Sequence, residues 1–206
     1  ITKNAEFAPE VSKSLTGVAI PTEKTFTFKL SGMPNNPSGA QLPGDEPTAE
    51  VTFPAGEHAD IRKDVFDPIT FTKAGTYQFK VEETGAAGNG YHNDTRYWVV
   101  TVEVTDTASE LNAELVSYEQ FNADGSKVTL EEAATSALFE NSYSVTSTKY
   151  VPKVEKRFSS DSDIRPSDNE KTFTFTMQAS PNNPQGASLN GEDVLTTSVV
   201  GDNEST

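Results

Sequence analysis

The chain has 206 residues, and 16 Lys and Arg against 31 Asp and Glu give it a net charge of −15. This charge disfavours nucleic acid and anionic membranes, because no run of basic residues supplies a positive patch, and no apolar run approaches the roughly 20 residues of a membrane-spanning helix. Cysteine is absent, which excludes disulfides and thiol catalysis, while 34% hydrophobic and 9% aromatic residues predict a folded chain with a thin, aromatic-rich core.

Stretches that alternate apolar and polar residues, rich in Val, Thr, Phe and Tyr, predict β-strands. The first strand lies around Lys13, and the clearest later ones are residues 25–30, 76–83, 97–105 and 138–143. Turn signals occur at 74–75, 88–90 and 123–125. Residues 130–137 are the only helix-like stretch, and they are short and ambiguous. Short strands at this spacing predict an all-β, antiparallel β-sandwich rather than alternating βαβ units.

An internal repeat divides the chain. Residues 24–44 return at 171–191 with more than half of the positions identical, including Lys-Thr-Phe-Thr-Phe and Pro-Asn-Asn-Pro in both copies. Such self-similarity indicates a repeated module. We therefore predict tandem modules: a complete sandwich at about residues 1–147, a junction at 148–152, and the N-terminal part of a second, truncated module at 153–206.

Strand alternation places a polar side chain among apolar ones on three strands of the first module. Lys13 lies between two apolar residues of one face, Glu83 ends an apolar row, and Asn141 lies between two aromatic residues. Each has an ordinary structural interpretation when taken alone. Lys13 would extend its amine to solvent, Glu83 would cap a strand end, and Asn141 would bond to the backbone.

Taken together, the three inward-pointing groups favour a reaction. Burial favours the neutral, nucleophilic amine of a lysine and the neutral acid of a glutamate. A neutral amine beside an amide carbonyl that a carboxylic acid polarises is arranged for one acyl transfer. The product would be a Lys–Asn isopeptide bond, with loss of ammonia.

Four segments carry a resemblance to a known family. They are Lys-Ser-Leu-Thr-Gly at 13–17, Phe-Thr-Lys-Ala-Gly-Thr-Tyr at 71–77, the 77–83 strand running on to Gly90-Tyr91, and Phe-Glu-Asn-Ser-Tyr at 139–143. Together they resemble the pilin isopeptide-linkage domains of Gram-positive surface proteins, which are immunoglobulin-like, CnaB-type modules of backbone pilins and adhesin stalks. The resemblance covers nearly all of residues 5–147. It implies Lys13 as the nucleophile, Asn141 as the amide attacked and Glu83 as the proton shuttle, whereas alternation puts Glu82 on the opposite face.

The resemblance implies a structural module of a pilus or adhesin stalk, cell wall-anchored on the outside of a Gram-positive cell. It would be no enzyme beyond a single self-directed turnover, it would need no cofactor, and its partners would be neighbouring modules or pilin subunits. The alternative is an adhesin module that binds a host protein or glycan through loops 33–47 and 84–95. His58 and His92 stand in no nucleophile motif, which argues against a Ser/His/Asp hydrolase. Without a signal-peptide pattern or an LPXTG-type sorting motif, the chain is expected to be a piece of a longer protein.

Two acidic segments invite a metal interpretation, which we do not favour. Residues 120–131 only loosely copy a calcium loop, and a hairpin turn explains them better. The acidic residues of the second segment suit a solvated linker better than a calcium site. These residues are Asp161, Asp163, Asp168 and Glu170.

Lys156 occupies the position of Lys13 in the second copy. The repeat would put its partner acid and amide beyond Thr206, so we expect Lys156 to be unreacted in this chain. The fragment after about Tyr150 would then be disordered, swapped or completed by strands of another polypeptide. Residues 150–153 faintly resemble the pilin lysine motif used in sortase polymerisation, but their place at a module junction favours a plain linker.

Overall fold

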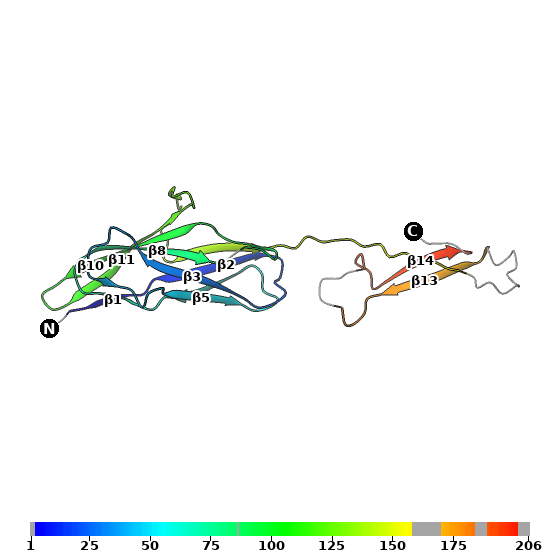
Figure 1. Cartoon of the computed structure of the whole chain (residues 1–206), viewed down its shortest axis with the longest axis horizontal. Helices are drawn as coiled ribbons and strands as arrows, with labels where there is room; N and C mark the ends of the chain where they lie inside the picture. Colours follow the sequence, from blue (N-terminus) through cyan, green and yellow to red (C-terminus); the bar gives the residue numbers. More distant parts are fainter. Residues whose placement is uncertain (1–2, 86, 158–169, 184–188, 202–206) are drawn as a thin grey trace. The chain divides into compact units, whose positions relative to one another are not determined.

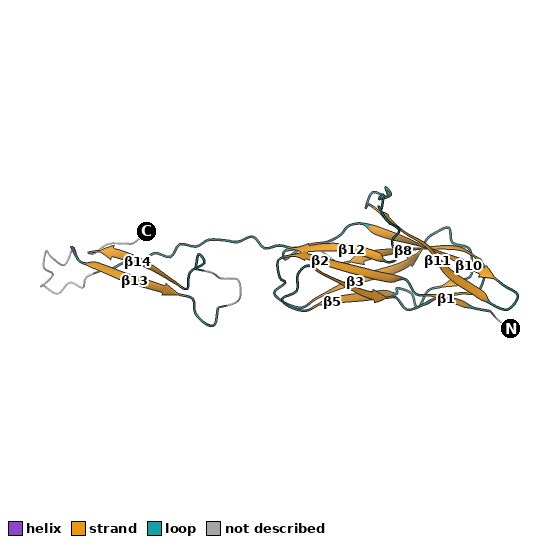
Figure 2. Cartoon of the chain, turned by 180° about the vertical axis from the view of Figure 1, so that it is seen from behind, coloured by secondary structure: helices purple, strands orange, loops and turns teal. Residues whose placement is uncertain are grey.

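The computed structural model describes residues 3–85, 87–157, 170–183 and 189–201. The chain divides into two compact units, Ile1–Val145 and Thr146–Thr206. Strands and loops build both, apart from a 3₁₀ position at Glu170, and no α-helix occurs in the described residues (Figure 2). In this part of the chain no helix is long and apolar enough to cross a membrane.

Two β-sheets form the body of the first unit (Figure 1). The larger has the order β11 (Leu111–Phe121), β10 (Tyr97–Asp106), β8 (Gly75–Thr84), β3 (Lys24–Gly32) and β5 (Thr48–Phe53). The smaller has the order β6 (Asp60–Val65), β2 (Glu10–Gly17), β12 (Ala137–Tyr143) and β9 (Tyr91–His92). The predicted all-β, immunoglobulin-like sandwich is thereby confirmed, and the strands predicted around 25–30, 76–83, 97–105 and 138–143 are β3, β8, β10 and β12.

The sequence missed a third, three-stranded sheet. It has the order β1 (Ala5–Phe7), β7 (Ile69–Phe71) and β4 (Ala40–Gln41). Two or three residues are too few to display a period, which explains the omission. Because β1 precedes it, the Lys13 strand is the second strand of the unit and not the first, a correction to the predicted order.

One strand pair departs from the antiparallel prediction. Strand β12 runs parallel to β2, with Phe139 opposite Lys13 and Asn141 opposite Leu15. All other ladders of the described residues are antiparallel. Parallel neighbours need a long crossover, and here almost the whole unit lies between the two strands. Alternation reveals which face a side chain takes, but it cannot reveal the direction of the neighbouring strand.

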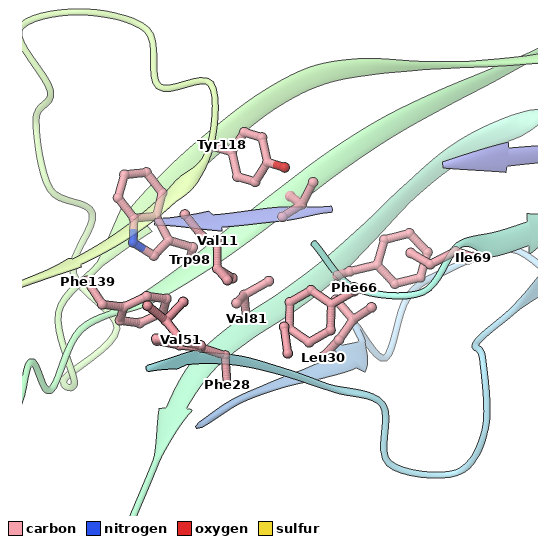
Figure 3. Close-up of a cluster of buried hydrophobic side chains, with 14 of the residues drawn as sticks. Val11, Phe28, Leu30, Val51, Phe66, Ile69, Val81, Trp98, Tyr118 and Phe139 are labelled. Atoms are coloured by element: carbon pink, nitrogen blue, oxygen red, sulfur yellow. The ribbon is translucent and has the colours of Figure 1, made fainter. Parts of the chain in front are cut away.

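The core lies between the two large sheets (Figure 3). Buried and more exposed residues alternate along β3 and β5, so Phe26, Phe28 and Leu30 point inward. Phe28 contacts Phe139 of the facing sheet, with ring centroids 5.0 Å apart. Trp98 of β10 donates from its indole Nε1 to the carbonyl of Leu138 at 2.9 Å. This aromatic packing and the hydrogen bond hold β12 against the larger sheet.

The helix-like stretch at 130–137 does not form a helix. Residues 130–136 are loop, and Ala137 begins β12. A helix of this length is marginal because few backbone bonds repay its nucleation. The hydroxyl of Ser136 lies 2.7 Å from that of Ser12 in β2, a buried hydrogen bond that ties the end of the loop to the smaller sheet.

The second unit contains an antiparallel pair, β13 (Thr172–Gln178) and β14 (Val194–Val200). Strand β13 is the repeat of β3, and its Phe173, Phe175 and Met177 alternate with more exposed residues. A common sequence thus gives a strand with the same alternation in both units. That this unit is the opening of a second module of the same type stays a prediction.

Gly17 provides a test of the contact between β2 and β12. Its φ is +101°, and a Cβ built there would lie 2.1 Å from the carbonyl oxygen of Tyr143. Gly56 has a similar φ of +89° but open space around its Cβ, so it reports backbone strain alone. We expect Gly56→Ala to lower the free energy of unfolding by about 1–2 kcal/mol. Gly17→Ala should lower it further, and thermal unfolding of both variants measures the difference. Equal losses would mean that β2 and β12 do not approach closely at this point.

Candidate functional site

Three strands from the two facing sheets bring the predicted residues together. Lys13 lies on β2 and Asn141 on the adjacent β12, where Asn141 pairs with Leu15, two residues along from Lys13 on the same inward face. Glu83 lies near the end of β8 in the opposite sheet. The parallel pairing of β2 and β12 places the lysine beside the amide. The facing sheet places the Glu83 carboxyl against both side chains.

The Glu83 carboxylate bridges the other two side chains. Lys13 Nζ donates to Glu83 Oε2 at 2.7 Å, and Asn141 Nδ2 donates to Glu83 Oε1 at 2.7 Å. The Lys13 side chain is 0% exposed and that of Glu83 is 2% exposed. Asn141 is also buried. A charged pair so fully removed from water is costly unless it is closely matched, which sets it apart from the surface ion pairs of this chain.

The environment of Lys13 favours its nucleophilic form. Burial lowers the pKa of the Lys13 amine below its ordinary value, and this effect outweighs the opposing attraction of Glu83. The ring of Phe26 lies under the amine, with Nζ 4.7 Å from the ring centroid. An amine held beside an amide in a dry, aromatic-lined site has the placement that an acyl transfer requires.

The neighbouring acid, Glu82, points away from this site. Its carboxylate pairs with Lys80 of the same strand, and its side chain is 37% exposed. The predicted division of the two adjacent glutamates between opposite faces is therefore confirmed. That Glu83 acts as the proton shuttle stays a prediction.

The other predicted positions are Lys156 and the two acidic segments. In the second unit, Lys156 Nζ donates to the carbonyl of Arg157 at 3.3 Å and lies 5.1 Å from the ring centroid of Phe173. In the 120–131 segment, β11 ends at Phe121 and a turn follows, in which Gly125 N–H donates to the Asn122 carbonyl. Over the described residues no group of His, Asp or Glu is arranged to hold a metal ion, while Asp161, Asp163 and Asp168 lie outside them.

Sequence reasoning missed the loop that completes the site. Asp94 N–H donates to Asn141 Oδ1 at 2.6 Å, and Asn93 Oδ1 accepts from Asn141 Nδ2 at 3.3 Å. Both residues lie between β9 and β10, inside the 84–95 loop that we considered only as a ligand contact. Their one sequence signal is the acid-base pair of Asp94 and Arg96, which is too common to indicate a site.

The fold and the buried Lys-Glu-Asn cluster define the class of protein: an isopeptide domain of the Gram-positive pilin type. A family model described as the Spy0128-like isopeptide containing domain (FctA) matches residues 9–144. The chain belongs to this family. The match spans all three residues of the cluster and ends before the second unit.

Solved structures agree on the fold. A variant of the major pilin from Streptococcus pyogenes matches with 22% identity and a TM-score of 0.53, covering 96% of this chain and 72% of the pilin chain. The major pilin protein T-13 from the same organism matches with 19% identity and a TM-score of 0.51, covering 96% of this chain and 74% of the other. A search of curated proteins found no match.

Proposed function

We propose that the chain is a structural part of a Gram-positive pilus whose first unit forms a spontaneous isopeptide bond between Lys13 and Asn141. The observation that carries the proposal is the Glu83 carboxylate, which accepts hydrogen bonds from both reacting side chains inside the core. Membership of the isopeptide family supports it. No comparison favours the alternative of a ligand-binding adhesin module.

The chemistry is a single acyl transfer. Glu83 takes a proton from Lys13, whose Nζ attacks the side-chain carbonyl carbon of Asn141. Glu83 then protonates Nδ2, which leaves as ammonia, and recovers a proton from the new amide nitrogen. One C–N bond forms and one breaks, so the protein turns over once and needs no cofactor.

The position of the bond suits a load-bearing role. Strands β2 and β12 are parallel neighbours near the two ends of the first unit. Tension applied to the two ends of the unit would shear these strands along each other. A covalent link between them would carry the load directly and leave the intervening strands unloaded. It would also reinforce a thin core without cysteine.

We place the protein outside the cell as part of a wall-anchored pilus or stalk, with neighbouring modules or pilin subunits as its partners. The pilin relatives support this location through their shared fold. In this setting the second unit, from Thr146 on, is the opening of a further module.

Intact mass spectrometry tests the bond. The purified chain is expected to weigh less than its sequence by one ammonia, and digestion should yield a branched peptide that joins the Lys13 and Asn141 segments. Peptide mapping should show Lys156 unmodified. A folded protein with the full sequence mass would overturn the proposal, and a loss of two ammonias would overturn the prediction for Lys156.

A further inference from the structure

The hydrogen bonds around Asn141 fix which way its amide points. A main-chain N–H can only donate, so the 2.6 Å contact from Asp94 N requires the carbonyl oxygen Oδ1 at that position. The nitrogen Nδ2 then faces two acceptors, Glu83 Oε1 at 2.7 Å and Asn93 Oδ1 at 3.3 Å. The leaving nitrogen is therefore directed to the proton donor, and the carbonyl oxygen to the β9–β10 loop. This corrects the expectation that the carboxylic acid polarises the carbonyl, because Glu83 contacts the nitrogen of the amide and Asp94 N–H contacts its oxygen.

The Asp94 side chain holds this loop on β12 at a second point. Its Oδ2 accepts from the main-chain N–H of Glu140 at 2.9 Å, while the N–H of the same residue contacts Asn141. Arg96 completes the arrangement: its Nε donates to Asp94 Oδ1 at 2.8 Å, and its Nη2 donates to Asp94 Oδ2 at 2.8 Å and to Glu140 Oε2 at 2.9 Å. One loop residue thus contacts two successive residues of the strand that carries the reacting amide.

The surroundings of the Asp94 carboxylate favour its ionised form. Its side chain is only 3% exposed, and burial by itself would raise its pKa. The hydrogen bonds from Arg96 and from the main-chain N–H groups of Glu140 and Arg96 outweigh burial and hold the pKa of Asp94 below its ordinary value. A buried charge with this many donors fixes the loop more firmly than a neutral contact would.

We propose that the main-chain N–H of Asp94 is the oxyanion donor of the isopeptide reaction, and that the Asp94 carboxylate, fixed by Arg96, is the positioning group that holds it. The inference rests on the proposed function. When Lys13 Nζ bonds to the carbonyl carbon, the electron pair of the C=O bond moves to Oδ1. The negative charge develops beside the Asp94 N–H and returns to the carbonyl when Nδ2 leaves as ammonia. Removing one such donor slows acyl transfer by about 100-fold to 1,000-fold in comparable sites.

Two substitutions at position 94 test the main-chain N–H and the carboxylate separately. Asp94→Pro removes both groups, whereas Asp94→Ala removes only the carboxylate. Asp94→Asn keeps the size of the side chain and an oxygen that can accept from Glu140 N–H. Asp124→Ala is the matched control, because that carboxylate also accepts from a main-chain N–H, that of Ser126, in a turn outside the site.

The experiment follows cross-linking in time. Each full-length variant is made by a short pulse of cell-free synthesis and quenched in acid at intervals, and intact mass gives the fraction that has lost ammonia. We expect Asp94→Pro to react about 100-fold to 1,000-fold more slowly than the unaltered chain. Asp94→Ala should be intermediate, Asp94→Asn should recover part of the rate because it keeps one of the two acceptor oxygens and loses the charge, and Asp124→Ala should react normally.

A merely structural role would change folding rather than the rate of the folded protein. The same substitutions are therefore compared in a Glu83→Gln background, where no bond is expected, and thermal unfolding there gives the folded fraction of each. Equal rates for Asp94→Pro and Asp94→Ala, both folded, would overturn the oxyanion assignment. If Asp94→Pro does not fold, an Asp94→Ala rate equal to that of the unaltered chain overturns the proposal, and a slowed rate that Asp94→Asn partly restores supports it.

Failure of the proposed function gives a different result. If the unaltered chain never loses ammonia, the Lys13–Asn141 bond itself is refuted, and this inference falls with it. If the unaltered chain cross-links and the folded Asp94 variants do so equally fast, only the role of Asp94 is refuted.

Discussion

Replacing Lys13 by methionine is expected to lower the melting temperature of the first unit by about 10–20 °C. Lys13 and Asn141 enclose most of the unit between them, so their bond closes a loop of more than 100 residues. By the loop-entropy estimate used for disulfides, a cross-link of this kind adds about 4–5 kcal/mol. Methionine keeps most of the stem volume and removes the amine, so the main change is loss of the bond.

Lys24→Met is the matched control for this substitution. Lys24 also lies near the aromatic rings of this region, with Nζ 4.8 Å from the ring centroid of Tyr91, but it has no amide to attack. We expect this variant to keep the ammonia loss and to melt close to the unaltered chain. A similar fall for Lys13→Met and Lys24→Met would mean that packing on the rings, and not a covalent bond, sets the stability.

A double-mutant cycle separates the bond from the local contacts. Lys13→Met and Asn141→Ala each remove the same bond, so the double variant cannot lose it twice. The two single effects are therefore expected to sum to well over the double effect, with a difference near the value of the cross-link. Additive losses would contradict a covalent link between the two residues.

The alternation of residues along the strands was enough to predict most of the buried site from the sequence. Lys13, Glu83 and Asn141 are polar positions within apolar rows, and a side chain on the inward face of a strand is buried whichever strand lies next to it. Glu82 and Glu83 illustrate the rule: they are adjacent in the sequence, but Glu82 faces solvent and Glu83 faces the core. The buried positions of these groups could therefore be inferred without knowing the topology.

The features that the sequence could not predict depend on which segments lie next to each other in the fold, and not on the alternation within a strand. The parallel pairing of β2 with β12 is a property of how the chain returns after β11. Asp94 contacts the amide because a loop between two strands ends beside β12, and a loop has no repeating pattern to read. Residues 130–136 resembled a short helix, but tertiary contacts such as the Ser12–Ser136 hydrogen bond decide their path.

Glu83→Gln is expected to abolish the bond while the sandwich still folds. Glutamine has nearly the same shape and can still accept one hydrogen bond, but it cannot take a proton from Lys13 and pass it to Nδ2. Loss of a positioned general acid-base group slows such reactions by about 100-fold to 10,000-fold. The measurement is the fraction of folded protein that has lost ammonia, followed by intact mass over the time in which the unaltered chain reacts. Glu82→Gln is the control, and it should lose one ammonia as the unaltered chain does.

The result also tests whether deprotonation of Lys13 limits the reaction. Burial lowers the pKa of the Lys13 amine, and Glu83 is the main group that opposes this effect. Removing the charge of Glu83 therefore leaves more of the amine neutral, so a poorer nucleophile cannot explain a loss of cross-linking. Absence of the bond in folded Glu83→Gln would instead assign the barrier to a later proton transfer through Glu83, either to the leaving Nδ2 or from the new amide nitrogen. If Glu83→Gln cross-links at the rate of the unaltered chain, Glu83 is only a structural partner, and the shuttle is refuted even though the bond exists.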